Sequence, residues 1–223
     1  MAARLVYCAL TFSAARALAP ARGGGVGGAR AASLGRAEVL RAGGGALAAA
    51  ALLGPRAAAA ADARTVAVAF GPAPDGRPLG AASFSVPGDW VRLSGDAGGG
   101  RSLTLYAAPD DADTNAFVLV TPVRGDYTSL GSFGNLETVQ DTVMPAADGV
   151  SYEVLETKAT GGAYRYEYTV QVPDQPKRHL ISVFAIEADS IVTFNFQARA
   201  DAFSPDVAKL AKATANSFKV GKA

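Results

Sequence analysis

The sequence is poor in the residues that most often carry out chemistry. Its 223 residues include one cysteine, one histidine and one tryptophan, and charged residues make up 18% of the chain. Cys8 lies in an N-terminal segment that we expect to be removed, which leaves no disulfide, thiol nucleophile or cysteine-ligated zinc site. No G-x-S-x-G or H-E-x-x-H pattern is present. We therefore expect that the protein is not an enzyme.

The charge of the chain is divided between two segments of opposite sign. Residues 1–61 contain seven arginines, no lysine and one acidic residue, Glu38, whereas residues 62–223 contain 14 basic and 19 acidic residues. The net charges are therefore +6 and −5, and the overall value of +1 is a cancellation. This asymmetry predicts a basic leader on an acidic domain. Because an acidic domain repels phosphate backbones, we expect no nucleic-acid partner.

The first quarter of the chain has the composition of targeting segments. Arg4 precedes an apolar run at 5–12 and small residues at 17–19, which predicts a secretory signal peptide over residues 1–19. The Arg-, Gly- and Ala-rich residues that follow are typical of a plastid transit peptide. A second apolar run at 46–53 leads into alanines suited to another cleavage. This run is far shorter than the roughly 20 residues needed to span a bilayer.

We interpret residues 20–63 as a plastid transit and lumen-targeting segment of low complexity. A protein needs three successive targeting signals to reach the thylakoid lumen of a plastid acquired by secondary endosymbiosis. A single long transit peptide is the alternative, and it also ends in a plastid. Both interpretations predict a chloroplast protein, and the first predicts a protein of the thylakoid lumen.

Residues 64–223 have the patterning of one mixed domain with a sizeable core. Several runs alternate apolar and polar residues or are rich in β-forming residues: 82–86, 90–93, 103–107, 117–123, 152–157, 164–172, 179–187 and 191–198. Gly or Pro at 87–89, 98–100, 161–162 and 173–176 supplies turns between neighbouring runs. Consecutive strands joined by short turns favour an antiparallel sheet.

Two segments have helical spacing instead. Over residues 132–144 apolar residues recur every three or four positions, and Pro145 ends the run. The second segment starts at Ser204, a suitable N-cap, with Pro205 in the first helical position. We therefore expect an α+β fold in which helices flank an antiparallel β-sheet.

An ordered series of residues over about 80–220 resembles the PsbP family, the extrinsic oxygen-evolving-complex proteins of photosystem II and their lumenal relatives. The matching positions are 84–87 with Trp90, Tyr106, Asp111, Asp113, Thr114, Asn115, 118–122, 129–132, 164–168, 178–181, 194–198, Ser217 and Phe218. The resemblance implies that residues 64–223 form a PsbP-like domain. It also implies an α/β/α sandwich, the fold shared with the Mog1-type Ran-binding proteins.

The function that the resemblance implies is support of photosystem II from the lumen. A PsbP protein is peripheral to the thylakoid membrane, binds lumenal subunits of photosystem II and helps retain calcium and chloride at the manganese cluster. Calcium would then act indirectly, through photosystem II, and not as this chain's own cofactor. The lysine-rich N-terminal segment typical of the plant subunit is missing, because residues 64–79 hold Arg64 and Arg77 as their cations. A photosystem assembly factor and a lumenal small-molecule or pigment-binding module remain as alternatives.

Oxygen ligands suited to a hard cation such as calcium follow the run at 103–107: Asp110, Asp111, Asp113 and Asn115. The EF-hand pattern is not met, because Ala116 stands where glycine is required and Pro122 where the bidentate glutamate is required. A polar turn, in which the side chains satisfy backbone amides, is the alternative interpretation.

His179 is the single histidine and a second candidate metal ligand. The family resemblance suggests Asp201 as its partner, and a structurally satisfied histidine at the start of a strand is the alternative. The aromatic residues Trp90, Tyr106, Tyr164, Tyr166 and Tyr168 either form a ligand platform or cover a sheet face.

Overall fold

The computed structural model describes residues 62–72, 78–123, 127–145 and 147–222. The predicted signal peptide over 1–19 lies outside these residues, as does the transit segment of residues 20–63 up to Ala61. The assignment of both segments therefore stays a prediction.

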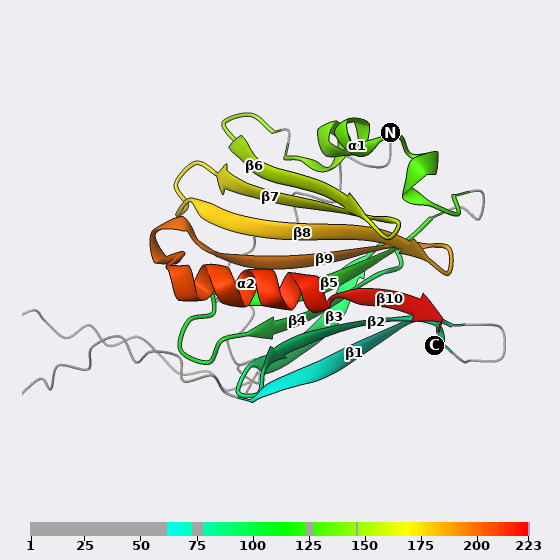
Figure 1. Cartoon of the computed structure of the whole chain (residues 1–223), viewed down its shortest axis with the longest axis horizontal. Helices are drawn as coiled ribbons and strands as arrows, with labels where there is room; N and C mark the ends of the chain where they lie inside the picture. Colours follow the sequence, from blue (N-terminus) through cyan, green and yellow to red (C-terminus); the bar gives the residue numbers. More distant parts are fainter. Residues whose placement is uncertain (1–61, 73–77, 124–126, 146, 223) are drawn as a thin grey trace, which may run out of the picture. The chain divides into compact units, whose positions relative to one another are not determined.

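A seven-stranded antiparallel sheet is the larger of the two sheets of the described chain (Figure 1). Its strands follow the order β3-β4-β5-β9-β8-β7-β6. Their bounds are β3 (Val91–Gly98), β4 (Arg101–Ala107), β5 (Asn115–Pro122), β6 (Ser151–Thr160), β7 (Ala163–Gln171), β8 (Arg178–Glu187) and β9 (Ser190–Arg199). All eight predicted runs of β-forming residues fall on strands, and each predicted turn lies between two consecutive strands.

A smaller antiparallel sheet has the order β1-β2-β10 and lies on the larger one. Its strands are β1 (Ala63–Pro72), β2 (Pro78–Pro87) and β10 (Lys219–Lys222). The sequence patterns predicted β2 but neither β1 nor β10. In β1 the side chains of Val68 and Phe70 alternate inward and are buried, so the strand forms because its apolar face completes the core.

The helices are fewer than the strands. α1 (Leu136–Val143) is capped by Asn135, whose side chain accepts a hydrogen bond from the backbone N–H of Thr138. It is shorter than the predicted 132–144, because the 3₁₀ helix η3 (Leu130–Ser132) takes the start of that segment. α2 (Pro205–Ser217) begins as predicted, with Ser204 as N-cap and Pro205 in the first turn, and follows the 3₁₀ helix η4 (Ala200–Ala202).

The larger sheet buries side chains on both of its faces. On one side, which we call the α2 face, Val118, Ile181 and Phe194 pack against Phe84 of β2 and Ala211 of α2. Figure 1 shows α2 running along β9 and β8, with β10 following at its end. This face holds the larger of the two cores because a helix and a second sheet both cover it.

The opposite side of the larger sheet, which we call the α1 face, carries a second core. There Tyr166, Leu180 and Phe184 pack with Leu130 of η3 and Val139 of α1. The two cores share the inner strand β8, whose successive side chains point to opposite faces.

The expected antiparallel sheet with two flanking helices is confirmed in outline. The fold is richer in sheet than an α/β/α sandwich, because the β1-β2-β10 sheet occupies part of the α2 face where a helical layer was expected. Among the residues described, no helix is long and apolar enough to cross a membrane.

Candidate functional site

The acidic turn between β4 and β5 uses its own side chains to hold its backbone. Asp111 Oδ1 accepts a hydrogen bond from the N–H of Asp113 at 3.1 Å, and its Oδ2 accepts one from Thr114 Oγ1 at 2.7 Å. Asn115 Nδ2 donates to the carbonyl of Ala112 at 2.9 Å. These contacts are those of a polar turn in which Asx side chains replace missing backbone partners.

Two members of this turn also reach across the α1 face of the sheet. Asp113 Oδ1 lies 2.7 Å from Arg178 Nη2, and the Arg178 side chain is buried. Asn115 Oδ1 accepts a hydrogen bond from Gln197 Nε2 at 3.1 Å. The predicted ligands Asp111, Asp113 and Asn115 thus have protein partners, and the described residues contain no group of three or more acidic, histidine or cysteine side chains placed to hold a metal ion.

His179 pairs with a carboxylate, but not with the one that was expected. Its Nε2 lies 2.9 Å from Glu167 Oε1, on the neighbouring strand β7. Its ring stacks on Phe203 with 3.6 Å between the ring centroids and 7° between the planes. Together these contacts fix the imidazole on the α2 face, in agreement with a structurally satisfied histidine.

Asp201 lies in η4 and bonds Arg199 instead of His179. Arg199 Nε donates to Asp201 Oδ1 at 3.0 Å, and Nη2 donates to Oδ2 at 2.5 Å, which makes the pair bidentate. The hydrogen-bonded Arg199 guanidinium holds the pKa of the Asp201 carboxyl below its usual range, and the Asp201 carboxylate in turn raises the pKa of Arg199. The pairing of His179 with Asp201 suggested by the family resemblance is therefore wrong in this chain.

Glu167 is the centre of a charged cluster on the α2 face. Besides His179, its carboxylate faces Lys212 Nζ of α2 at 3.7 Å and Arg165 Nη2 at 3.9 Å. Arg165 also donates from Nη1 to Asn216 Oδ1 of α2 at 2.8 Å. The cluster joins α2 to β7 and β8, and the Glu167 side chain is 8% exposed.

Several buried polar atoms of this part of the chain have no hydrogen-bond partner. They include Glu167 Oε2, Thr169 Oγ1 and Arg165 Nε on the α2 face of β7, and Arg178 Nε and Nη1 on the α1 face. Ordered water is the usual partner of such groups.

The tyrosines of β7 cover the α1 face and hold the helix on it. Tyr164 OH donates to the carbonyl of Gly134 at 3.1 Å, and Tyr166 OH donates to the carbonyl of Leu136 at 2.8 Å. Burial raises the pKa of Tyr166 and of Tyr168, so both stay protonated. Trp90 and Tyr106 are buried in the core on the α2 face. These aromatic residues serve packing and helix contact in the described chain, and not an open platform.

Sequence reasoning missed Glu167 and Arg178, and of the two only Glu167 carried a signal. The run Tyr164-Arg165-Tyr166-Glu167-Tyr168 alternates aromatic and charged residues in a strand, which places both charges on the face opposite the tyrosines. A buried arginine was not foreseeable in the same way, because its partner Asp113 lies 65 positions earlier.

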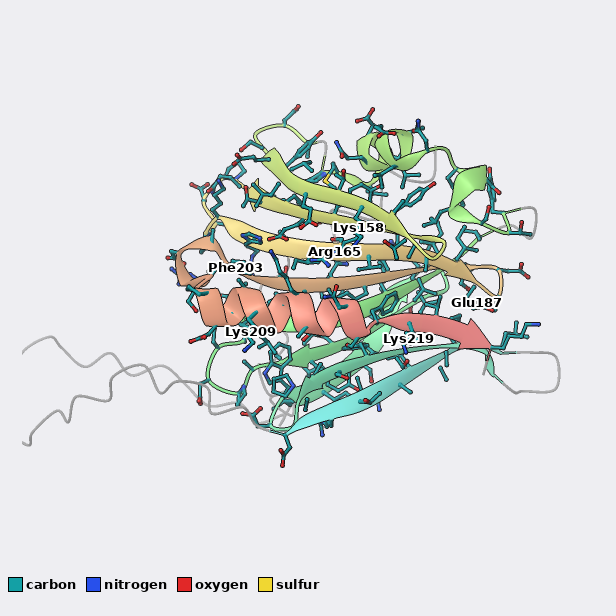
Figure 2. All side chains as sticks on the ribbon, in the orientation of Figure 1. Lys158, Arg165, Glu187, Phe203, Lys209 and Lys219 are labelled. Atoms are coloured by element: carbon teal, nitrogen blue, oxygen red, sulfur yellow. The ribbon has the colours of Figure 1, made fainter. Side chains whose placement is uncertain are left out.

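Four exposed lysines have no acidic partner among the residues that the structure describes. They are Lys158 of β6, Lys209 of α2, and Lys219 and Lys222 of β10. Figure 2 shows Lys158, Lys209 and Lys219 in one view of the molecule. These lysines are free to contact another molecule.

A family model described as PsbP matches residues 80–220. The chain is 27% identical over 110 residues to the PsbP domain-containing protein 3, chloroplastic, of Arabidopsis thaliana, a match that covers 46% of this chain and 44% of that protein. The chain thus spans less than half the length of this relative. The solution structure of cyanobacterial PsbP (CyanoP) from Synechocystis sp. PCC 6803 is similar with a TM-score of 0.46 and 21% identity, over 70% of this chain and 92% of that one.

Proposed function

This chain belongs to the PsbP family, and on that premise we propose that it is a non-enzymatic protein of the thylakoid lumen that binds photosystem II and supports its oxygen-evolving complex. Its contribution would be to stabilise the manganese cluster and to help photosystem II retain calcium and chloride. The family match carries this proposal, because it extends from β2 to β10 and includes every strand of the larger sheet.

The location proposed rests on the leader and on a relative. The leader has the order of segments expected of a protein sent through a plastid to the lumen. The similar Arabidopsis protein is described as chloroplastic. The two observations are of different kinds, since one concerns the composition of the leader and the other a similar protein.

The side-chain arrangement supports binding by surface complementarity. The carboxylates of Asp111, Asp113, Glu167 and Asp201 already have protein partners, whereas the exposed lysines named above are unpaired in the described chain. We propose that calcium retention is indirect: the protein would cover the lumenal side of photosystem II and slow the loss of ions held there.

Fractionation of thylakoids tests this proposal. We expect the protein inside the lumen, released from the membranes by high salt and co-migrating with photosystem II at low salt, because contacts between exposed charges are screened by salt. Its absence from the organelle, or recovery with a different complex, would contradict the proposal.

An assembly factor of the PsbP-domain type is the second candidate, and one feature of the fold favours it. Residues 63–72 form β1, and Arg64 donates from Nη2 to the carbonyl of Trp90 at 2.6 Å. This segment is part of the folded domain instead of a basic arm available for binding. In the same fractionation, a protein that stays free in the lumen and associates with photosystem II only during assembly or repair would favour this candidate over the stoichiometric subunit.

A further inference from the structure

Strands β6 and β7 place like charges directly opposite each other at two neighbouring positions. Lys158 faces Arg165, and Glu156 faces Glu167, in the register of the pair. All four side chains lie on the α2 face, since Arg165 and Glu167 face Val183 and Ile181 of that core. Figure 2 shows Lys158 and Arg165 side by side on the two strands. Like charges directly opposite one another destabilise a sheet.

The two β7 charges are compensated within the molecule, but the two β6 charges are not. Glu167 faces His179 and Lys212, and Arg165 binds Asn216. Glu156 and Lys158 have no ion pair among the residues that the structure describes. The uncompensated charges therefore lie on the outer strand.

That outer strand is an open edge of the seven-stranded sheet. In the described chain β6 is hydrogen-bonded to β7 on one side and to no strand on the other. Every residue from Leu155 to Thr160 is exposed, and Leu155, at 49%, is one of the most exposed large apolar residues. An edge of this kind offers unpaired backbone N–H and C=O groups to another strand.

The order of charges along β6 is complementary to itself when the strand is reversed. If a second copy pairs antiparallel with its two-fold axis at Thr157, Glu156 faces Lys158 of the second copy and Lys158 faces its Glu156. Residues opposite each other in an antiparallel pair lie on the same face, so both contacts form on the α2 face. The two basic side chains Arg165 and Lys158 of one copy then lie beside the two acidic side chains Glu156 and Glu167 of the second copy.

From this complementarity we propose that the β6 edge joins two copies of the chain into a symmetric dimer with a continuous sheet. Leu155 faces Ala159 of the second copy in this register, which covers part of the exposed apolar surface. The bulge between Val154 and Glu156 ends the regular pairing on the N-terminal side. The paired segment is therefore short, and the dimer is weak, reversible and sensitive to salt.

The charges of β6 favour a second copy of the chain, and not an unrelated strand, as the partner of this edge. A foreign strand would need a base and an acid spaced two positions apart in the required order, whereas a second copy carries them by symmetry. The proposal is independent of the function proposed above, because it rests on β6 and β7 alone.

Sedimentation velocity of the full chain over a range of concentrations tests the dimer with three variants. K158E places Glu156 opposite a glutamate of the second copy at both symmetric contacts, and we expect the dimer to weaken about 10-fold or more. The double variant E156K/K158E restores opposite charges and is expected to restore the dimer. K209E makes the same charge change on α2 and is expected to leave the dimer unchanged.

Thermal unfolding of the same variants separates the dimer contact from an effect on folding. Within one molecule K158E replaces the like-charged pair with Arg165 by an opposite pair, so the monomer is expected to be at least as stable as the parent. A parent chain that stays monomeric at all concentrations would overturn the proposal, as would equal weakening by K158E and K209E or failure of E156K/K158E to restore the dimer.

Discussion

Glu167 is the residue at which the charged contacts of the α2 face meet. A carboxylate with 8% exposure is costly to bury alone, but here it faces His179, Lys212 and Arg165 from two strands and a helix. Its removal would leave Arg165 and His179 partly buried without an acidic partner. The residue therefore ties α2 to the larger sheet by charge in addition to apolar packing.

We expect Glu167→Ala to destabilise the fold by about 3 kcal/mol, because breaking a buried ion pair from one side leaves the other charge uncompensated. Glu167→Gln, which keeps the shape and removes the charge, should cost a large part of this. Chemical denaturation monitored by tryptophan fluorescence measures both.

Glu153→Ala is the matched control. Glu153 is 68% exposed and lies 3.8 Å from Lys177, so the loss of its carboxylate should cost less than about 1 kcal/mol. Equal losses of folding free energy at the two positions would contradict a stabilising role of the buried cluster around Glu167.

The pair Arg199–Asp201 makes a prediction about pH. Because the hydrogen bonds from Arg199 lower the pKa of Asp201 in the folded state, the pair favours folding at neutral pH. This contribution is lost as the pH falls through the folded-state pKa. Arg199→Gln should raise the Asp201 pKa toward its ordinary value, as measured by NMR titration of the side-chain carboxyl carbon. An unchanged pKa in the variant would refute the assigned cause.

The side chains that bind one another were only partly predictable from the sequence. Asx side chains in the turn after β4 were predicted as a polar alternative, because their spacing is a local property. The partner of His179 was not predictable, because it depends on which strands are neighbours. β7 lies beside β8 and brings Glu167 to the imidazole, while Asp201 lies beyond the end of β9 and meets Arg199 first.

Among the elements, the two strands that sequence patterns missed are β1 and β10, which flank β2 in the smaller sheet. β1 alternates Val66, Val68 and Phe70 with alanines and follows directly on the alanine-rich leader, so its pattern was hidden by the composition around it. β10 has four residues and becomes a strand by pairing with β2, a partner 136 positions earlier at Lys219–Ser83. Strands of the larger sheet were predictable because glycine and proline mark their hairpins. Gly161 and Gly162, for example, have φ of 59° and 81° between β6 and β7.

Gly80 tests whether β1 packs on β2 as described. A Cβ at Gly80 would lie 2.6 Å from Cε2 and 2.7 Å from Cζ of the buried Phe70 ring. We expect Gly80→Ala to destabilise the protein by about 1 to 3 kcal/mol, since the ring has to shift within a packed core. Thermal or denaturant unfolding measures the change.

Two controls isolate the cause of that loss. Gly95→Ala in β3 meets nothing within 4 Å and should be close to neutral. Phe70→Leu should reduce the cost of Gly80→Ala when the two are combined, because a smaller side chain leaves room for the new methyl group. If the costs of Phe70→Leu and Gly80→Ala simply added, the two residues would not be in contact.

In the whole molecule, the leader and the domain have net charges of opposite sign. Within the domain, acidic and basic residues are concentrated in different elements. Removal of the leader predicted over residues 1–63 would turn a near-neutral precursor into an acidic protein. On that domain the residues from α1 through the first part of β6 include Glu137, Asp141, Asp148, Glu153 and Glu156, whereas α2 and β10 carry four lysines and one acidic residue. A protein with such separated charges binds in a preferred orientation to a partner of complementary charge.

Rebinding to stripped membranes tests whether the protein supports oxygen evolution by photosystem II. Photosystem II membranes from the same source are stripped of extrinsic proteins with high salt, and the protein isolated from that source is added back at low salt. We predict saturable binding, and recovery of oxygen evolution at calcium and chloride concentrations that do not sustain the stripped membranes. No binding, or binding without any recovery of oxygen evolution at low calcium and chloride, would contradict the account.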